Sequence, residues 1–212
     1  MNRFIKMHMI ILSILMLFLL GTGLIGFIMY FRKTLSGIEK GTYQIINQEI
    51  QLREQVTKLI VADEKLVLFY EDAGYVAVYT QTGEFLYGIQ VDTSDKGTGN
   101  ISFLDGGLVI KSKANSVYYF DGSFLIDSFH ISSDNLDQYR LLEKRMGDHS
   151  ALTASTNGID FSVSNGNIVK TTLLGTNAIV FPLPRRKMNP VFLCSFFLGV
   201  TLLLLLNKYN NS

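Results

Sequence analysis

The amino-acid sequence predicts a mainly β protein in which antiparallel repeats lie between two transmembrane helices. Two observations lead to this prediction. Long uncharged apolar runs stand near both ends of the 212-residue chain, and the part between them consists of short β-branched and aromatic runs separated by turn residues. We therefore expect a transmembrane helix over 9–31, a juxtamembrane segment over 32–57, a β-rich domain over 58–184 and a second transmembrane helix over 188–206.

The first apolar run extends from Met9 to Phe31 and contains no charged residue. A helix rises about 1.5 Å per residue, so a run of this length crosses a hydrocarbon core of roughly 30 Å. A cleaved signal peptide is the alternative, because Gly21-Thr22-Gly23 offers small residues for cleavage. Since the apolar core of a signal peptide spans only about 7–15 residues, the length of the run favours an uncleaved helix.

Three glycines in this run, Gly21, Gly23 and Gly26, match the GxGxxG spacing of a dinucleotide-binding turn, and Glu39 follows near the place of a ribose-binding acid. Such a turn requires a strand before it, a helix after it and βαβ units around it. The chain instead continues into a membrane boundary and strands, so we interpret the match as an accident of composition. Gly23 and Gly26 do share a helix face, which allows another helix to approach closely.

The second apolar run covers Val191 to Leu206 and follows Pro190. If the helix starts at residue 188, it is long enough to span a thin bilayer. The alternative is a buried helix in the core of a soluble domain. Basic residues near the spans favour a two-pass protein with a cytoplasmic middle domain. Six flank the middle domain (Arg32, Lys33, Lys40, Arg185, Arg186, Lys187) and three lie beyond the spans (Arg3, Lys6, Lys208). A single-span anchor with an exported domain stays open.

Three segments of the middle part have similar sequences. Residues 66–68, 76–79 and 83–86 align with 108–110, 117–120 and 122–125, and a weaker third copy contains 159–161, 168–169 and Gly175. A period of about 40 to 50 residues with four short strands is typical of β-propeller blades. Each copy carries a glycine at a turn, where a tight hairpin needs a residue that tolerates positive φ.

This unit resembles a blade of the NHL or quinoprotein type over roughly residues 59–181. The overall layout resembles uncharacterised bacterial membrane proteins that hold a few such repeats between two spans, and this resemblance implies a location in a bacterial plasma membrane. The resemblance implies stacked sheets with Phe85 and Phe124 filling the space between them. A closed propeller has about four to eight blades and this chain has room for three, so either the sheets form an open propeller-like array or two chains complete one ring. A generic meander or sandwich is the alternative fold.

Two further segments complete the expected fold. A short helix is predicted near 134–146, because its apolar residues form one stripe and Gly147 can end it; the stripe consists of Leu136, Tyr139, Leu142 and Met146. In the juxtamembrane segment, the alternation of residues 43–45 and 50–52 favours two short strands over a helix.

The sequence contains no GxSxG, HExxH or CxxC motif and no Gly-Lys pair of a phosphate loop. The loop 91–100 carries Asp92 and Asp95, as a calcium loop would, but its spacing differs from that of an EF-hand, and a plain loop between repeats is favoured. The single cysteine, Cys194, lies in an apolar run. We therefore expect no catalytic residue, no cofactor and no metal, and the net charge of +1 argues against a nucleic-acid partner.

The predicted function is that of a membrane-tethered, non-catalytic β-repeat domain that acts as a protein-interaction scaffold. Its expected partners are the lipid bilayer and a protein, and a homo-oligomer stays open. The alternative is a module that senses a small molecule or a sugar on a stacking surface of strand tyrosines; these are Tyr75, Tyr79, Tyr87, Tyr118 and Tyr119. The lack of any catalytic constellation argues against an enzyme.

Overall fold

The structure is a computed structural model that describes residues 3–31, 35, 38–93, 97–148, 150–172, 175, 177–184 and 189–210. The chain divides into two compact units. One consists of Met1–Lys33 together with Arg186–Ser212, and the other of Thr34–Arg185. The first unit is helical and the second is built from antiparallel sheets, so the predicted class, mainly β with an apolar helix at either end, is confirmed.

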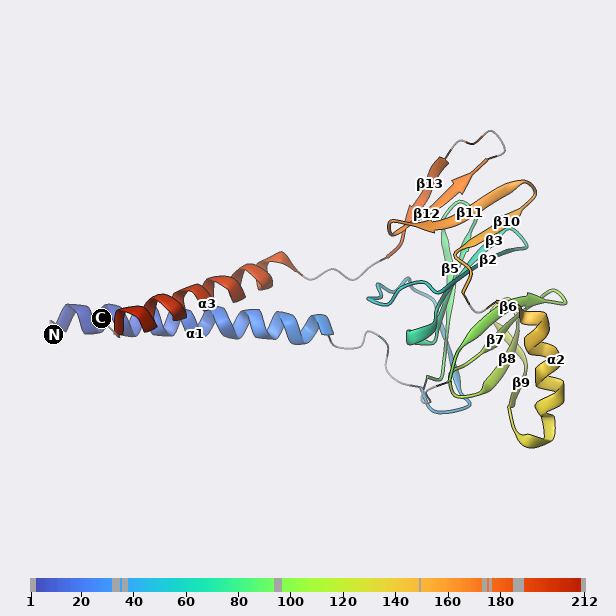
Figure 1. Cartoon of the computed structure of the whole chain (residues 1–212), viewed down its shortest axis with the longest axis horizontal. Coiled ribbons are helices and arrows are strands. Elements are labelled where there is room, and N and C mark those ends of the chain that lie inside the picture. Colours follow the sequence, from blue (N-terminus) through green and yellow to red (C-terminus); the bar gives the residue numbers. More distant parts are fainter. Residues whose placement is uncertain are drawn as a thin grey trace. The chain divides into compact units, whose positions relative to one another are not determined.

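The helical unit contains α1 (Arg3–Phe31) and α3 (Pro190–Asn210), which lie side by side in opposite directions (Figure 1). Both are long and apolar enough to cross a membrane. The helices approach closely at glycines. A Cβ atom on Gly23 would lie 2.6 Å from Cβ of Phe196, and one on Gly26 would lie 2.0 Å from Cγ of Phe192, whereas nothing lies within 4 Å of such an atom on Gly21. The close approach expected at Gly23 and Gly26 is therefore made by α3 of the same chain.

The second unit contains three antiparallel sheets. Sheet 1 has the order β1-β5-β4-β3-β2, sheet 2 the order β6-β7-β8-β9, and sheet 3 the order β10-β11-β12-β13. Sheet 1 is formed by β1 (Tyr43–Ile46), β2 (Lys58–Ala62), β3 (Lys65–Tyr70), β4 (Tyr75–Thr80) and β5 (Phe85–Val91). Sheet 2 is formed by β6 (Asn100–Leu104), β7 (Gly107–Lys111), β8 (Ser116–Asp121) and β9 (Phe124–His130). Sheet 3 is formed by β10 (Thr153–Thr156), β11 (Ile159–Ser164), β12 (Asn167–Thr171) and β13 (Asn177–Pro182).

Each sheet contains four strands that follow one another in sequence, as in a propeller blade. The first strands of the repeats meet, since β2 lies beside both β6 and β10. The backbone amide of Leu59 in β2 donates to the carbonyl of Ala151, just before β10, at 2.7 Å. The turns after β4 and β8 contain Gly83 at φ 93° and Gly122 at φ 58°, a conformation that favours glycine.

Sheet 1 lies between the other two sheets. Successive side chains of a strand point to opposite faces, and β3 uses both faces for packing: Leu66 and Leu68 belong to the core shared with sheet 3, while Val67 and Phe69 belong to the core shared with sheet 2. The three sheets therefore form a stack with two apolar interfaces.

The two ends of the stack differ. The helix α2 (Leu136–Met146) lies beside sheet 2 (Figure 1), after the short 3-10 turn η2 (Ser133–Asn135). It packs against Val109 and Val117 on the outer face of this sheet. Tyr139, Leu142 and Met146 are buried, whereas Leu136, the first residue of the expected stripe, is 38% exposed. The outer face of sheet 3 is largely polar, and the register places on it Thr153, Ser155, Asp160, Ser162, Val169, Thr171 and Ile179. The sheets thus form an open array whose ends are a helix and a polar face.

The expected role of Phe124 between the sheets is wrong. Phe85 does pack in the core between sheets 1 and 3, but Phe124 is 79% exposed. It pairs with Asp121 at the end of β9, and a bulge in the pairing follows between Tyr119 and Phe120. Its face is the one covered by α2, and Phe124 lies outside the cluster that the helix forms with this face.

Candidate functional site

The five tyrosines predicted to form a stacking surface do not share an exposed face. Tyr75 and Tyr79 belong to the core between sheets 1 and 3, and Tyr118 belongs to the core between sheets 1 and 2. All three are at most 1% exposed, while Tyr87 and Tyr119 are half-buried. Alternation along a strand predicts which residues share a face, but it does not show that another sheet covers that face.

Aromatic side chains surround the buried Tyr79. Its ring centroid lies 4.6 Å from that of Phe181 and 5.5 Å from that of Phe85, the latter edge-on. Burial raises the pKa of Tyr75 and of Tyr79, and the carboxylate of Glu49 raises both further. These contacts tie sheet 1 to sheet 3, because Phe181 belongs to β13, and they assign Tyr79 a packing role.

Two buried lysines hold α2 against the sheets. Nζ of Lys58 in β2 donates to Oδ1 of Asn100 at 2.9 Å and to the carbonyl of Met146 at 3.2 Å. Nδ2 of Asn100 donates to the carbonyl of Gly147 at 3.3 Å. These donors satisfy carbonyls at the end of α2 that have no partner within the helix. Burial lowers the pKa of Lys58, and the carboxylate of Asp148 partly opposes this shift.

Lys111 makes the second attachment. Its Nζ donates to the carbonyl of Thr98 at 2.6 Å and lies 5.8 Å from the ring centroid of Tyr139 on α2. The Tyr139 hydroxyl donates in turn to Glu143 at 2.6 Å. Burial lowers the pKa of Lys111, while the carboxylates of Glu143 and Glu71 oppose the shift. A buried lysine with a lowered pKa is a candidate nucleophile, but the ammonium groups of Lys58 and Lys111 are both engaged with backbone carbonyls that position the helix and the loop.

Asp92, considered above as part of a cation loop, is an anchor for the juxtamembrane segment. It is fully buried, and its Oδ2 accepts from the backbone amide of Gly41 at 2.7 Å and from the Ser116 hydroxyl at 3.3 Å. The Tyr118 hydroxyl donates to the carbonyl of Thr42 at 3.0 Å. Asp95 lies outside the described residues, and the described residues contain no group of three or more His, Cys, Asp or Glu side chains arranged to hold a metal.

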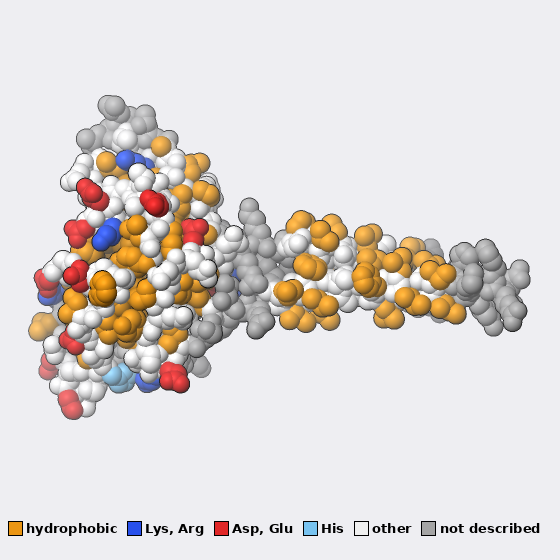
Figure 2. Space-filling model, turned by 180° about the vertical axis from the view of Figure 1, so that it is seen from behind, with side chains coloured by type: hydrophobic (Ala, Val, Ile, Leu, Met, Phe, Trp, Pro, Cys, Tyr) orange, Lys and Arg blue, Asp and Glu red, His pale blue; other side chains and the backbone are white. Residues whose placement is uncertain are grey.

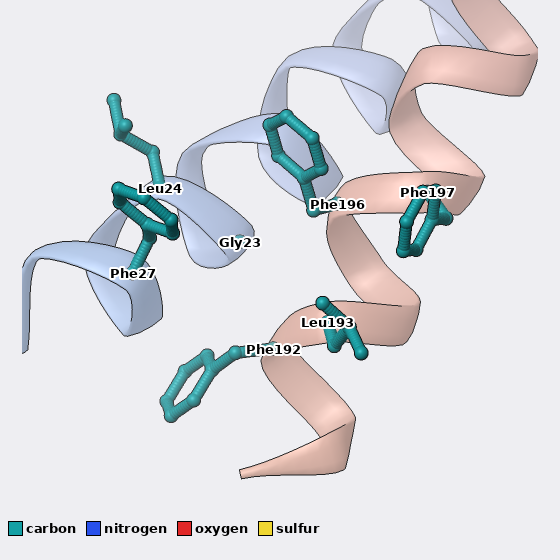
Figure 3. Close-up of a pocket in the computed structure, with 7 residues that line it drawn as sticks. All are labelled: Gly23, Leu24, Phe27, Phe192, Leu193, Phe196 and Phe197. Atoms are coloured by element: carbon teal, nitrogen blue, oxygen red, sulfur yellow. The ribbon is translucent and has the colours of Figure 1, made fainter. Parts of the chain in front are cut away.

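A pocket of about 280 Å³ lies between the two helices of the first unit (Figure 3). In Figure 3, Gly23 of α1 faces Phe196 of α3, and the rings of Phe27 and Phe192 flank the space beside them. The lining is entirely apolar and consists of Gly23, Leu24, Phe27, Phe192, Leu193, Phe196 and Phe197. A site without any polar side chain has no group to orient a polar ligand or to carry out chemistry.

The outer edges of the sheets are not equally covered. The edge of sheet 1 is occupied by β1, which pairs with β5. Next to β13, at the edge of sheet 3, the backbone amide of Leu52 donates to the carbonyl of Pro184 at 3.2 Å. Sheet 2 ends in β9, and no described strand pairs with the outer side of β9. This strand exposes 79% of Phe124 and 67% of Ile126.

Acidic side chains accompany these two apolar residues. Asp121 and Asp127 are exposed, and neither forms an ion pair within the described part of the chain. Figure 2 shows one face of the domain, on which hydrophobic side chains gather with acidic side chains around them. We call Asp121, Phe124, Ile126 and Asp127 the β9 edge surface. The sequence does not reveal this surface, because the residue pattern of β9 is the same for a covered and an uncovered strand.

No protein-family model and no curated protein matches the sequence. Similar solved structures include virginiamycin B lyase from Staphylococcus aureus, with 14% identity and a TM-score of 0.30 over 68% of this chain and 47% of the lyase. They also include the computationally designed Ika4 protein (18% identity, TM-score 0.29, 68% of this chain and 78% of that one). A third is glutaminyl cyclase from Myxococcus xanthus (14% identity, TM-score 0.25, 68% and 54%). The chain spans about half the length of the lyase and the cyclase. The lyase folds are β-propeller-like.

Proposed function

We propose that the chain is a membrane-tethered, non-catalytic β-repeat domain that binds a protein partner through the β9 edge surface. The observation that carries the proposal is the combination of an uncovered edge strand with two large apolar side chains that solvent reaches. Natural proteins usually protect an exposed strand edge, because its unpaired N–H and C=O groups accept another chain. Exposed apolar side chains on such an edge are a feature of interaction sites.

The helices supply the tether in this proposal. Two apolar helices of spanning length would hold the domain at a bilayer in a two-pass arrangement, and the excess of basic residues flanking the middle domain favours the cytoplasmic side. Other candidate groups of the domain have internal roles. The buried lysines and Asp92 are engaged in internal contacts, and Tyr75, Tyr79 and Tyr118 are in the cores.

The test uses two isoleucines of equal exposure. A photo-crosslinking amino acid replaces Ile126 of β9 (67% exposed) or Ile179 of β13 (66% exposed) in the full chain, in intact membranes. We expect a protein adduct of defined mass from position 126 and not from position 179. Phe124→Asp in the same chain should abolish that adduct. Equal adducts at both positions, or an adduct that Phe124→Asp leaves unchanged, would contradict binding through the β9 edge surface.

A further inference from the structure

The structure also indicates how a partner binds this edge, an inference that rests on the proposed function. We infer that the partner supplies a short extended segment of apolar and basic residues, which adds to β9 as an antiparallel strand. The chain itself contains an example of a strand added in this way.

The example is β1, which adds to the edge of sheet 1. The strand comes from the juxtamembrane segment, outside the repeats, and pairs antiparallel with β5, the last strand of its repeat. Only four residues are paired, from Tyr43 to Ile46. Ile46 belongs to the core between sheets 1 and 3, Ile45 packs on the core between sheets 1 and 2, and the Tyr43 ring contacts that of Phe120 edge-on at a centroid distance of 5.3 Å. One edge of the stack is therefore already completed by an added strand of four residues.

The strand β9 has the same place in its repeat as β5, since each is the last of four consecutive strands. Part of its backbone is already engaged. The amide of Ser128 donates to Oδ1 of Asp127 at 2.8 Å, and the carbonyl of His130 accepts from Nδ2 of Asn135 at 2.9 Å. The stretch 124–127 before these contacts is four residues long, the length that β1 occupies on β5.

The side chains at this stretch define the chemistry of the added segment. Phe124 and Ile126 require apolar partners, while the register places Asp121, Phe124 and Asp127 on one face of the sheet. Because both carboxylates lack an ion pair in the described part of the chain, they favour lysine or arginine in the facing positions. A cation opposite Asp127 would also draw its carboxylate away from the Ser128 amide and release that donor for pairing. A second copy of β9 paired antiparallel over 124–127 fits less well, because it would place Phe124 opposite each Asp127 and supply no lysine or arginine.

The test measures binding of defined peptides to the full chain in lipid nanodiscs. The probe is a short fluorescent peptide of alternating isoleucine and lysine, and its fluorescence anisotropy gives Kd. A copy with N-methylated backbone amides keeps the side chains but loses the donors, and we expect it to bind about tenfold more weakly, as the loss of one or two hydrogen bonds implies. Asp127→Lys should weaken binding of the lysine peptide and strengthen binding of a peptide with glutamate in place of lysine, whereas Asp160→Lys on the outer face of sheet 3 should change neither.

Strand addition, the partner's chemistry and the proposed function would each be contradicted by a different result. Equal binding of the N-methylated peptide would overturn strand addition and leave the proposed function standing, provided that the adduct at position 126 still depends on Phe124. An adduct at position 126 that consists only of a second copy of this chain would overturn the partner's chemistry. If no adduct at position 126 depends on Phe124, the proposed function is wrong, whatever the peptide measurements give.

Discussion

Two phenylalanine-to-alanine substitutions test the stacked arrangement directly. Phe161 of β11 is fully buried in the core that sheet 3 shares with sheet 1, whereas Phe124 of β9 is 79% exposed. The chemical change is the same at both positions, and both residues belong to antiparallel sheets. Deletion of a buried phenylalanine side chain costs about 3–5 kcal/mol of unfolding free energy, because apolar contacts are lost and a cavity remains. An exposed substitution stays within about 0.5 kcal/mol.

The assay is urea unfolding of the full chain in nanodiscs. The chain has no tryptophan and ten tyrosines, so tyrosine fluorescence and near-ultraviolet circular dichroism report on the sheets. With a slope of about 2 kcal/mol per molar urea, Phe161→Ala should lower the midpoint by about 2 M. Phe124→Ala should leave the midpoint in place. Phe161→Leu keeps most of the volume and should give an intermediate shift, which separates packing from a specific effect of the ring.

Equal midpoint shifts for the two alanine variants would refute this reasoning. They would mean that sheet 3 does not use Phe161 to pack on sheet 1, and the division into a buried and an exposed face of sheet 3 would be wrong. A large shift for Phe124→Ala alone would likewise contradict the exposure of β9.

Three further substitutions have expected outcomes. Gly26→Leu should separate α1 from α3, measured by energy transfer between dyes on the two helices, while Gly21→Leu should not, since a Cβ atom at Gly21 meets nothing within 4 Å. Burial raises the pKa of Tyr79. The protonated Tyr79 therefore contributes fully to stability below about pH 10, and this contribution is lost as the pH rises towards the folded-state pKa. In urea titrations above pH 10, Tyr79→Phe should lose less stability than the unmodified chain. Asp92→Asn weakens the charge-assisted bond from the Gly41 amide, and hydrogen exchange of residues 41–46 should accelerate, in contrast to Asp137→Asn on the exposed side of α2.

Several elements follow from the sequence because local physics specifies them. The apolar runs are long enough for spanning helices, and turn glycines separate strands of four to seven residues. The helix α2 has an apolar stripe on one side. The close contact at Gly23 and Gly26 also follows from their shared helix face, although the sequence does not say which helix fills it. In each case the residues that carry the signal are near one another in the chain.

The burial of Tyr75, Tyr79 and Tyr118 does not follow from local patterns, because it depends on contacts between sheets. A signal for the correct placement was nevertheless present. The runs of β3 and β4, KLVLFY and YVAVYT, are apolar almost without interruption, as strands covered on both faces are. The run of β11, IDFSVS, alternates with polar residues, and one of its faces is solvated. The uninterrupted runs identify sheet 1 as the middle of the stack and therefore assign Tyr75 and Tyr79 to the core.

The position of α2 determines which part of sheet 2 stays uncovered. The outer face of sheet 2 carries Val109 and Val117, and without a cover it would be an exposed apolar patch. The helix covers Val109 and Val117. Its attachment uses Lys58 and Lys111, whose burial is unfavourable unless their ammonium groups have acceptors. Carbonyls of the helix end and of the Thr98 loop supply these acceptors. A helix can cover a face in this way, but it offers no backbone donors or acceptors to the neighbouring strand edge. Within the described part of the chain, residues 124–127 of β9 therefore have no strand on their outer side.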